Sequence, residues 1–455
     1  MKNNIYKKAL WLAIPMMVQS GITNAVSLVD NVMVGSLGTE CMTAVSIVGQ
    51  LIFVFNLAVF GGLSGPTIYS AQYYGQGNNE GVKSVFRFKW WIGIACLLIG
   101  VAVMYLFQDN LIHMYLQGQD GGIDAALTLQ HGKEYMNIML LGFLPFVVTQ
   151  IYAGSLRETG DSIKPMVAGI CSVFTDVILN YILIYGKFGF PALGVRGAAI
   201  ATVIARVVEM SVVILWAHCQ KEKHVFLQGV YRTMKVPGQM AKVVLKKSLP
   251  IFFNEFLWAG GLAVLTQCYS QRGLSVVAGI NISNAICNLL NVVFVSMGNA
   301  VGILIGQMLG ASEYDKAKKS SVRLMWFTGG ITMILTLILV GISGVFPTLY
   351  DTSEQVRWYG KNFIIITALF FPVQGFLNAL YFTLRSGGKT VVTFLFDSVY
   401  SWVVSVPVAF ALCNYTEISI LEVYAMIQAL DMIKLVVGYV LIKKGVWVTN
   451  LVEET

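Results

Sequence analysis

The chain has 455 residues, of which 56% are hydrophobic and only 12% are charged. Because soluble globular proteins carry about 25% charged residues, this composition excludes an ordinary soluble protein, and the mean hydropathy of +0.70 places most of the chain in lipid. The net charge of +8 is interpreted as a topology signal beside anionic headgroups, and nucleic-acid binding is not expected.

Twelve apolar runs are long enough to cross a bilayer, since a spanning helix needs about 20 mostly apolar residues. In chain order they cover residues 9–34, 44–74, 90–107, 135–156, 165–185, 195–217, 248–270, 276–309, 324–346, 363–384, 391–412 and 423–442. The sequence therefore predicts an all-α integral membrane fold with about twelve transmembrane helices.

Basic residues are concentrated on one side of this topology. Most of the 31 lysines and arginines lie in loops on the side of the N-terminus, so the positive-inside rule places both termini in the cytoplasm. The longest of these loops is basic and joins the two halves of the chain. We predict an N-lobe at 1–218 with helices 1–6, a cytoplasmic linker at 219–247 and a C-lobe at 248–455 with helices 7–12.

The two halves repeat each other at a nearly constant offset. Pairs separated by 235 positions are Pro15 and Pro250, Gly38 and Gly273, Gln72 and Gln307, Gly75 and Gly310, and Trp91 and Trp326. Further along, the offset is 228, as from Arg157 to Arg385, which suits a longer loop in the first half around residues 117–124. Six spans per half predict parallel repeats related by an axis along the membrane normal. Gly75 and Gly310 are expected to be helix C-caps.

Four carboxylates lie well inside predicted spans, at Asp30, Asp176, Glu255 and Asp397. A charge at membrane depth costs about 2.5–3.5 kcal/mol even on lenient scales, so each is a functional candidate. Asp30 is interpreted as a proton or Na⁺ carrier. Its carboxyl could change protonation with the exposed side, or Asp30, Asp176, Asn180 and Thr202 could supply hard oxygen ligands to a cation. The alternative is that these acids only fix helix packing.

In the second half, Glu255 lies beside Asn254 and could bind the cationic group of a substrate or carry a proton. Asp397 is a second candidate there for transport or for packing. Glu209 and Asp431 also lie in spans, but a basic residue stands three positions away from each. Structural ion pairs with Arg206 and Lys434 are expected for those two.

The eighth span carries a row of amides on one helix face, at Asn281, Asn284, Asn288 and Asn291. Such a face does not suit contact with lipid. We expect it to line a central wet cavity that binds substrate, and interhelical hydrogen bonding is the alternative.

Several kinds of site find no support in the sequence. The seven cysteines show no CxxC spacing, and no HExxH, P-loop or Rossmann pattern occurs. Free thiols, no cofactor and no enzymatic activity are therefore expected. No metal is expected other than Na⁺ at Asp30, Asp176 and Asn180.

Five segments together resemble the multidrug and toxic compound extrusion (MATE) family of secondary transporters. They are VDNVMVGSLG at 29–38, LRETGD at 156–161, LNYILIYG at 179–186, LGVRGAAIAT at 193–202, and Pro250 followed by Asn254 and Glu255. The resemblance covers essentially the whole chain. It implies twelve helices in two six-helix lobes that form a V, and export of organic, often cationic, compounds coupled to inward Na⁺ or H⁺ flow.

The resemblance also implies an ion-binding group in the N-lobe, formed by an acid of the first span with polar residues of the fifth and sixth. Asp30 matches that acid. Some family members carry Asn and then Asp four residues later in the fifth span, whereas this chain has Asp176 and then Asn180. Both positions share one helical face, so the group can survive the exchange, and its ion preference stays open.

The sequence thus predicts a secondary active antiporter in the cytoplasmic membrane that exchanges small organic compounds for H⁺ or Na⁺ by alternating access. A monomer and a cationic or amphipathic substrate are expected. One alternative is a lipid-linked precursor flippase of the same superfamily, which would favour a broad cationic cavity. Another is a membrane-embedded enzyme, which would need catalytic residues clustered near an interface.

Overall fold

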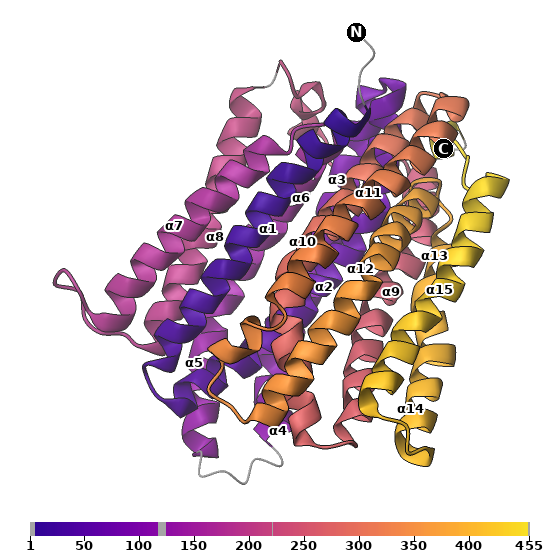
Figure 1. Ribbon diagram of the computed structural model, residues 1–455. Coiled ribbons are helices and arrows are strands. Elements are labelled where there is room, and N and C mark those ends of the chain that lie inside the picture. The colour runs from indigo at the N-terminus through magenta and orange to yellow at the C-terminus, as the bar shows by residue number, and fades with distance from the viewer. Residues whose placement is uncertain (1–4, 117–123, 221, 454–455) are drawn as a thin grey trace. The chain divides into compact units, whose positions relative to one another are not determined.

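The computed structural model describes residues 5–116, 124–220 and 222–453, and within these ranges the regular structure is entirely helical (Figure 1). The α-helices are α1 (Ile5–Gly35), α2 (Thr39–Gln76), α3 (Asn79–Leu106), α4 (Gln108–Leu116), α5 (Ala125–Met139), α6 (Phe143–Glu158), α7 (Ile163–Tyr185), α8 (Val195–Cys219), α9 (Gly238–Ser270), α10 (Leu274–Gly310), α11 (Tyr314–Ile342), α12 (Glu354–Ser386), α13 (Thr390–Phe394), α14 (Val406–Tyr415) and α15 (Ile420–Lys444). In this described part of the chain, twelve helical segments are long and apolar enough to cross a membrane, which confirms the predicted fold class.

Two differences from the prediction have local causes. The fourth span starts earlier than expected and consists of α5, a 3₁₀ turn at Leu140–Gly142 and α6. Residues 130–134 of α5 are polar, but Asp124 caps the helix by accepting hydrogen bonds from the backbone N–H groups of Ala126 and Leu127, as N-cap carboxylates do. The short α4 was not predicted, because its nine residues are too few to read as a span. The region expected to hold the longer first-half loop lies mostly outside the described residues.

The chain divides into two compact units. The N-unit comprises Val18–Ser70 and Asn79–Ala241, and the C-unit comprises Met1–Met17, Ala71–Asn78 and Lys242–Thr455. Three helices, α1, α2 and α9, are therefore divided between the units. The lobes at 1–218 and 248–455 remain a prediction.

In the N-unit, α7 packs along α8, and α8 also contacts α5 and α6 (Figure 1). Small residues allow this close approach. A Cβ atom on Gly197 would lie 2.6 Å from the carbonyl oxygen of Leu183, and the N–H of Leu193 donates to that same oxygen at 2.9 Å. The α7–α8 pair therefore holds the fifth and sixth spans in a fixed register, which matters for the polar residues they carry.

The predicted linker is folded onto the N-unit. Phe226, Leu227 and Val230 are buried. The Arg87 side chain donates to the carbonyl oxygen of Val230 at 2.9 Å, and the Trp91 indole donates to that of Met234 at 3.0 Å. Most of the linker is thus a structured part of the N-unit rather than a loose tether.

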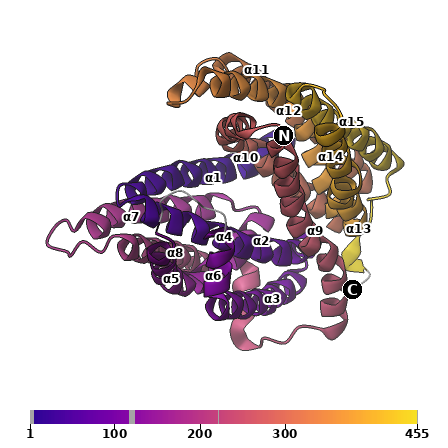
Figure 2. The same ribbon diagram turned by 90° about the horizontal axis from the view of Figure 1, so that it is seen from below.

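In the C-unit, α12 is the central helix and contacts α10, α11 and α15 (Figure 2). Glycines face large side chains at these crossings: Gly298 lies against Phe382, and Gly329 lies against Phe376. The eleventh span is irregular. Between α13 and α14 it contains two π-helical turns, Leu395–Val399 and Ser401–Ser405.

The predicted repeat is confirmed in the backbone. Left-handed residues occur at matching positions of the two halves: Gly38 and Gly273, Gly77 and Ser312, and Gly160 and Gly388. Gly77 directly follows α2, and Ser312 is the second residue after α10, so they supply the left-handed turn at those ends. The expectation that Gly75 and Gly310 are C-caps is wrong. Both lie within their helices, where the absence of a side chain lets another helix approach.

Candidate functional site

The N-unit brings together all four polar residues predicted for an ion-binding group. Asn180 on α7 donates its amide to Oδ1 of Asp30 on α1 at 2.9 Å. Asp176, one turn earlier on α7, interacts with Asp30 and with the hydroxyl of Thr202 on α8. Asp176 and Asn180 are both buried, at 8% and 1% exposed. The i, i+4 spacing on α7 directs both side chains toward the helix that carries Asp30.

This group has more acceptors than donors. Oδ1 of Asp176 and Oδ1 of Asn180 are buried and accept no hydrogen bond from the described residues. The Thr202 hydroxyl donates to the carbonyl oxygen of Ala198 at 3.1 Å. Two neighbouring carboxylates among unsatisfied oxygens are costly to bury unless a positive charge is added. The arrangement is chemically suited to a proton or to a small, hard cation.

Two arginines near this group interact with Glu209. Glu209 has Arg157 and Arg206 as electrostatic neighbours, and Arg206 also acts on Asp176. Gln19 connects them, since its amide donates to Glu209 at 3.4 Å and accepts from Arg157 at 2.8 Å. The predicted ion pair of Glu209 with Arg206 is not formed as a direct contact among the described residues: Arg206 acts on Glu209 only electrostatically, and its side chain donates to the carbonyl oxygen of Gly142 at 3.3 Å. The sequence prediction missed Gln19 and Arg157, which lie far from Glu209 in the chain.

The C-unit contains a second polar group around Asn254 on α9. Its amide donates to Oδ2 of Asp397 at 3.0 Å and to the hydroxyl of Tyr381 at 3.3 Å, while its own Oδ1 accepts from Ser398 at 2.7 Å. Asp397 and Ser398 belong to the first π-helical turn of the eleventh span. Such turns occur frequently at functional sites, and this one places two consecutive side chains on Asn254.

Each acid of this second group has a cationic neighbour. Lys434 pairs with Asp431 at 2.9 Å, as the sequence predicts, and also acts electrostatically on Asp397. Gln374 donates to Asp431 at 2.6 Å. Glu255 has Arg385 as its main charged neighbour and Asp397 as a further one. Glu255 therefore belongs to the group electrostatically, and Asn254 belongs to it through hydrogen bonds.

The amide row on α10 lies on the side of that helix away from its packed face. Asn281, Asn284 and Asn288 are exposed and Asn291 is half-buried. Asn291 donates to Asn288 at 3.2 Å. The opposite face, with Ile282 and Ile286 among others, is buried. The cavity that this row was expected to line remains a prediction.

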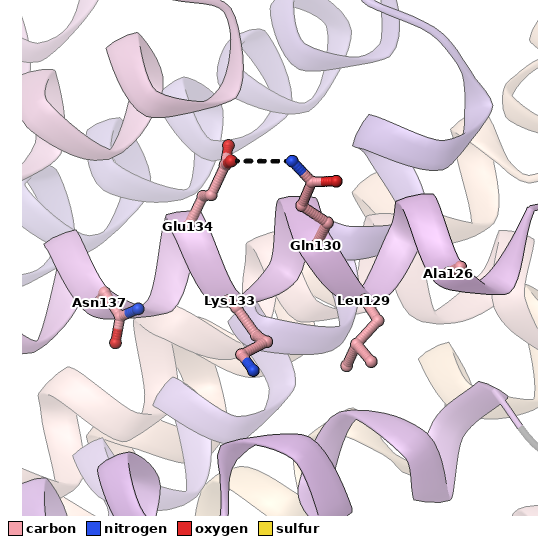
Figure 3. Close-up of a pocket in the computed structure, with 6 residues that line it drawn as sticks. All are labelled: Ala126, Leu129, Gln130, Lys133, Glu134 and Asn137. Carbon is pink, nitrogen blue, oxygen red and sulfur yellow. Dashed lines mark hydrogen bonds between the residues drawn. The ribbon is translucent and has the colours of Figure 1, made fainter.

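One surface pocket is lined by none of the predicted site residues. It has a volume of about 410 Å³ and is lined by Ala126, Leu129, Gln130, Lys133, Glu134 and Asn137, all on α5 (Figure 3). Its charges are already paired: Glu134 binds Arg196 at 2.8 Å and Lys133 binds Asp109 at 2.7 Å. We assign no role to it.

Comparisons with known proteins agree with the sequence motifs. A family model described as MatE matches residues 15–182 and 250–411. The chain is 26% identical over 452 residues to "Probable multidrug resistance protein YoeA" of Bacillus subtilis, covering 96% of this chain and 93% of that protein. It is 25% identical over 427 residues to "Probable multidrug resistance protein NorM" of Thermotoga maritima, covering 92% and 88%.

Solved structures agree on the fold. An outward-facing multidrug resistance MATE family transporter of the MOP superfamily matches with a TM-score of 0.85 at 19% identity, covering 97% of this chain and 96% of that one. A MOP superfamily transporter from Pyrococcus furiosus, whose structure reports a binding pocket of reverse polarity, matches with a TM-score of 0.83 at 19% identity and the same coverage. The chain belongs to the MatE family, the multidrug and toxic compound extrusion transporters.

Proposed function

We propose that the protein is a secondary active antiporter that exports small organic compounds in exchange for H⁺ or Na⁺ by alternating access. The single observation that carries this proposal is the contact of Asp30, Asp176 and Asn180 inside the apolar helices of the N-unit. Buried acids at membrane depth mark ion pathways in transporters. Relatives named as probable multidrug resistance proteins support transport in the outward direction.

The coupling ion acts on the charge balance of the N-unit group. Three carboxylates, Asp30, Asp176 and Glu209, face two guanidinium groups, Arg157 and Arg206. One more positive charge neutralises the group, so it binds one H⁺ or one Na⁺. An ion that binds one conformation more tightly shifts the equilibrium toward it by its difference in affinity. Ion entry from outside can therefore drive the return of the transporter after substrate release.

The C-unit group is proposed to receive the substrate. Glu255, Asp397 and Asp431 face Arg385 and Lys434, which again leaves room for one positive charge. A monovalent organic cation fits that balance, and nearby aromatic rings such as Tyr381 can contact it. The exposed amides on α10 provide further hydrogen-bonding partners, which favours a cationic or amphipathic substrate.

The remaining properties follow from the same proposal. Basic residues are in excess in the loops on the same side of the membrane as the N-terminus. This excess favours insertion in the cell membrane with both termini in the cytoplasm. Each unit carries its own polar group, so a monomer suffices for transport. A flippase of the same superfamily is less well supported, because acids outnumber cations in both groups. A membrane-embedded enzyme is less well supported, because the described residues contain no cluster of three or more His, Cys, Asp or Glu side chains that could hold a metal ion.

Purified protein in proteoliposomes tests the proposal. An imposed inward pH or Na⁺ gradient is expected to drive efflux of at least some members of a panel of cationic dyes and metabolites. Liposomes without protein, and protein-containing liposomes without a gradient, are the controls. If no panel member responds to either gradient, while movement of a lipid-linked precursor does, the antiporter proposal is wrong and the flippase is favoured.

A further inference from the structure

The side of α11 away from its packed face carries an unbroken row of exposed residues. α11 packs mainly against α10 and α12 (Figure 2). The residues of the row recur alternately three and four positions apart, as one face of a helix requires. From the N-terminal end they are Lys316, Lys319, Arg323, Trp326, Gly330, Met333 and Leu337, and all seven are exposed. We call this row the α11 stripe.

The chemistry of the α11 stripe changes from one end to the other. Three cations occupy its first two turns, a tryptophan follows, and glycine, methionine and leucine make up the rest. One leaflet of a bilayer has the same order, because charged headgroups lie above an interface that favours tryptophan, and the acyl chains lie below it. The stripe therefore has the layered chemistry of a single phospholipid laid along the helix.

The cations at the start of the stripe are only partly neutralised by the protein. Lys316 pairs with Glu313 at 2.7 Å. Among the described residues, Lys319 and Arg323 have no ion-pair partner, although Asp315 stands one turn before Lys319. The spacing of four residues places the two cations one turn apart on the same face. Together they can bind one phosphate group, to which an arginine can donate two parallel hydrogen bonds.

Trp326 is held in place beside these cations. It is 66% exposed, and its ring meets that of Phe376 on α12 edge to face, with the ring centroids 5.0 Å apart. Gly330 lies one turn further on, where an added Cβ atom would meet nothing within 4 Å. The helix backbone is bare at that point, so an acyl chain can lie close against it between Trp326 and Met333.

The other half of the repeat shows how an equivalent tryptophan is used. Trp91 on α3 is the counterpart of Trp326, and its indole donates to the carbonyl oxygen of Met234 in the folded linker at 3.0 Å. Ser84 and Phe88 occupy the positions equivalent to the two unpaired cations. Among the described residues, no protein group accepts a hydrogen bond from the Trp326 indole. In the second half, the acceptor can therefore come from a lipid, which carries phosphate and ester oxygens at this depth.

We propose that the α11 stripe is a binding site for one anionic phospholipid. Lys319 and Arg323 hold the phosphate diester of the headgroup. The indole N–H of Trp326 donates to a phosphate or ester oxygen, and one acyl chain lies over Gly330. A zwitterionic lipid brings a cationic group close to Lys319 and Arg323, so an anionic headgroup is preferred.

A second copy of the chain fits the stripe less well. Two copies related by a two-fold axis along the membrane normal would place the same ends of both stripes side by side. Lysine and arginine would then face lysine and arginine, which is unfavourable at the edge of a medium of low dielectric constant. The charge of the stripe thus favours a lipid. This inference goes beyond transport, and it holds whichever ion and substrate the protein uses.

Binding of defined lipids tests the proposal without any transport measurement. The purified full chain is titrated with phosphatidylglycerol and, separately, with phosphatidylcholine of the same acyl chains, and bound lipids are counted by native mass spectrometry. We expect the first phosphatidylglycerol to bind about ten times more tightly than the first phosphatidylcholine, because its phosphate makes charge-assisted hydrogen bonds that no cationic headgroup opposes. Lys319→Gln with Arg323→Gln should abolish that preference. Equal affinity for the two lipids in the unmodified chain would overturn the proposal.

Lys242→Gln with Lys246→Gln is the matched control. These two lysines are exposed and also stand one turn apart near the N-terminal end of a spanning helix, α9, but Leu249 occupies the place that corresponds to the tryptophan. The control removes the same two charges and should keep the preference for phosphatidylglycerol. If both double variants lose the preference alike, binding follows the overall surface charge, and the α11 stripe is not a site.

Trp326→Phe tests the proposed hydrogen bond, since it removes the indole N–H and keeps a ring to pack on Phe376. The affinity for phosphatidylglycerol should fall about fivefold, as expected for the loss of one hydrogen bond. Trp91→Phe should leave it unchanged, because that indole is already bonded to the linker. Equal effects of the two variants would contradict the role of Trp326. A stable dimer that excludes lipid from the unmodified chain would overturn the lipid in favour of a second copy.

Discussion

The polar groups of the two units carry the same formal charges in different arrangements. Each has three carboxylates and two cations, and Arg157 and Arg385 occupy equivalent positions of the repeat. In the C-unit every acid has a cationic neighbour. In the N-unit the interactions that reach Asp30 come from Asp176 and Asn180. Asp30 therefore has another carboxylate as a neighbour, and an added ion can compensate the resulting excess of negative charge.

This difference teaches how a repeat can divide two tasks. The two halves of the repeat share left-handed turns and arginines at matching positions. Their acids, in contrast, occupy positions that do not match between the halves. A contact between carboxylates makes the N-unit group depend on a mobile ion. In the C-unit group each carboxylate has a cationic neighbour, so the group stays compensated when no substrate is bound. A substrate site needs this property when it releases its substrate.

The largest expected effect comes from Asp176→Asn. It removes one of the two carboxylates in contact, so the N-unit group no longer needs an added charge. We expect gradient-driven efflux to fall about a hundredfold, to the level of leak. The exchange Asp176→Asn with Asn180→Asp restores the carboxylate on the same helical face, and it should recover much of the rate in proteoliposomes. Equal loss in the single and double variants would mean that the position of the carboxylate, rather than the charge of the group, is what matters.

A smaller effect is expected from Lys434→Met. The variant leaves the C-unit group with two uncompensated carboxylates in place of one. Binding of a monovalent organic cation, measured by fluorescence titration, should tighten about tenfold, or 1.4 kcal/mol. Adding Asp431→Asn restores the balance and should return the affinity to that of the unmodified chain. If both variants weaken binding alike, Lys434 and Asp431 only hold α15 in place.

The smallest of these effects is expected from Glu255→Gln. It neutralises the C-unit group without disturbing the hydrogen bonds of Asn254 with Asp397. The KM for a cationic substrate should rise several-fold, because one attractive negative charge is removed from the group, while ion uptake without substrate stays unchanged. A fall in ion uptake with an unchanged KM would reverse the roles given to the two units.

How much of the site could be predicted depended on how local its contacts are. Asp176 with Asn180, and Asp431 with Lys434, are separated by four and three residues on one helix, so spacing alone placed them together. The contact of Asp30 with α7 came from the family resemblance. Gln19, Arg157 and Glu209 meet only through the packing of three helices, and no sequence period marks such a contact.

The same reasoning explains the parts of the fold that were missed. The spans follow from apolar length, and the repeat follows from shared glycines and arginines. Gly75 was assigned to a cap because a glycine near a helix end usually terminates it. Its actual role depends on the carbonyl oxygen of Gln307, which is more than two hundred residues away. The folded linker was missed because its buried residues are few and scattered among basic ones.

The most direct test of the division of tasks is ion movement itself. Uptake of H⁺ or ²²Na⁺ into proteoliposomes is measured during substrate export for Asp30→Asn and for Asp397→Asn. The account predicts that Asp30→Asn abolishes coupled ion uptake, and that Asp397→Asn retains ion uptake while export needs more substrate. If Asp30→Asn moves the ion at the unmodified rate with its usual number of ions per substrate, the N-unit group does not couple the transport cycle.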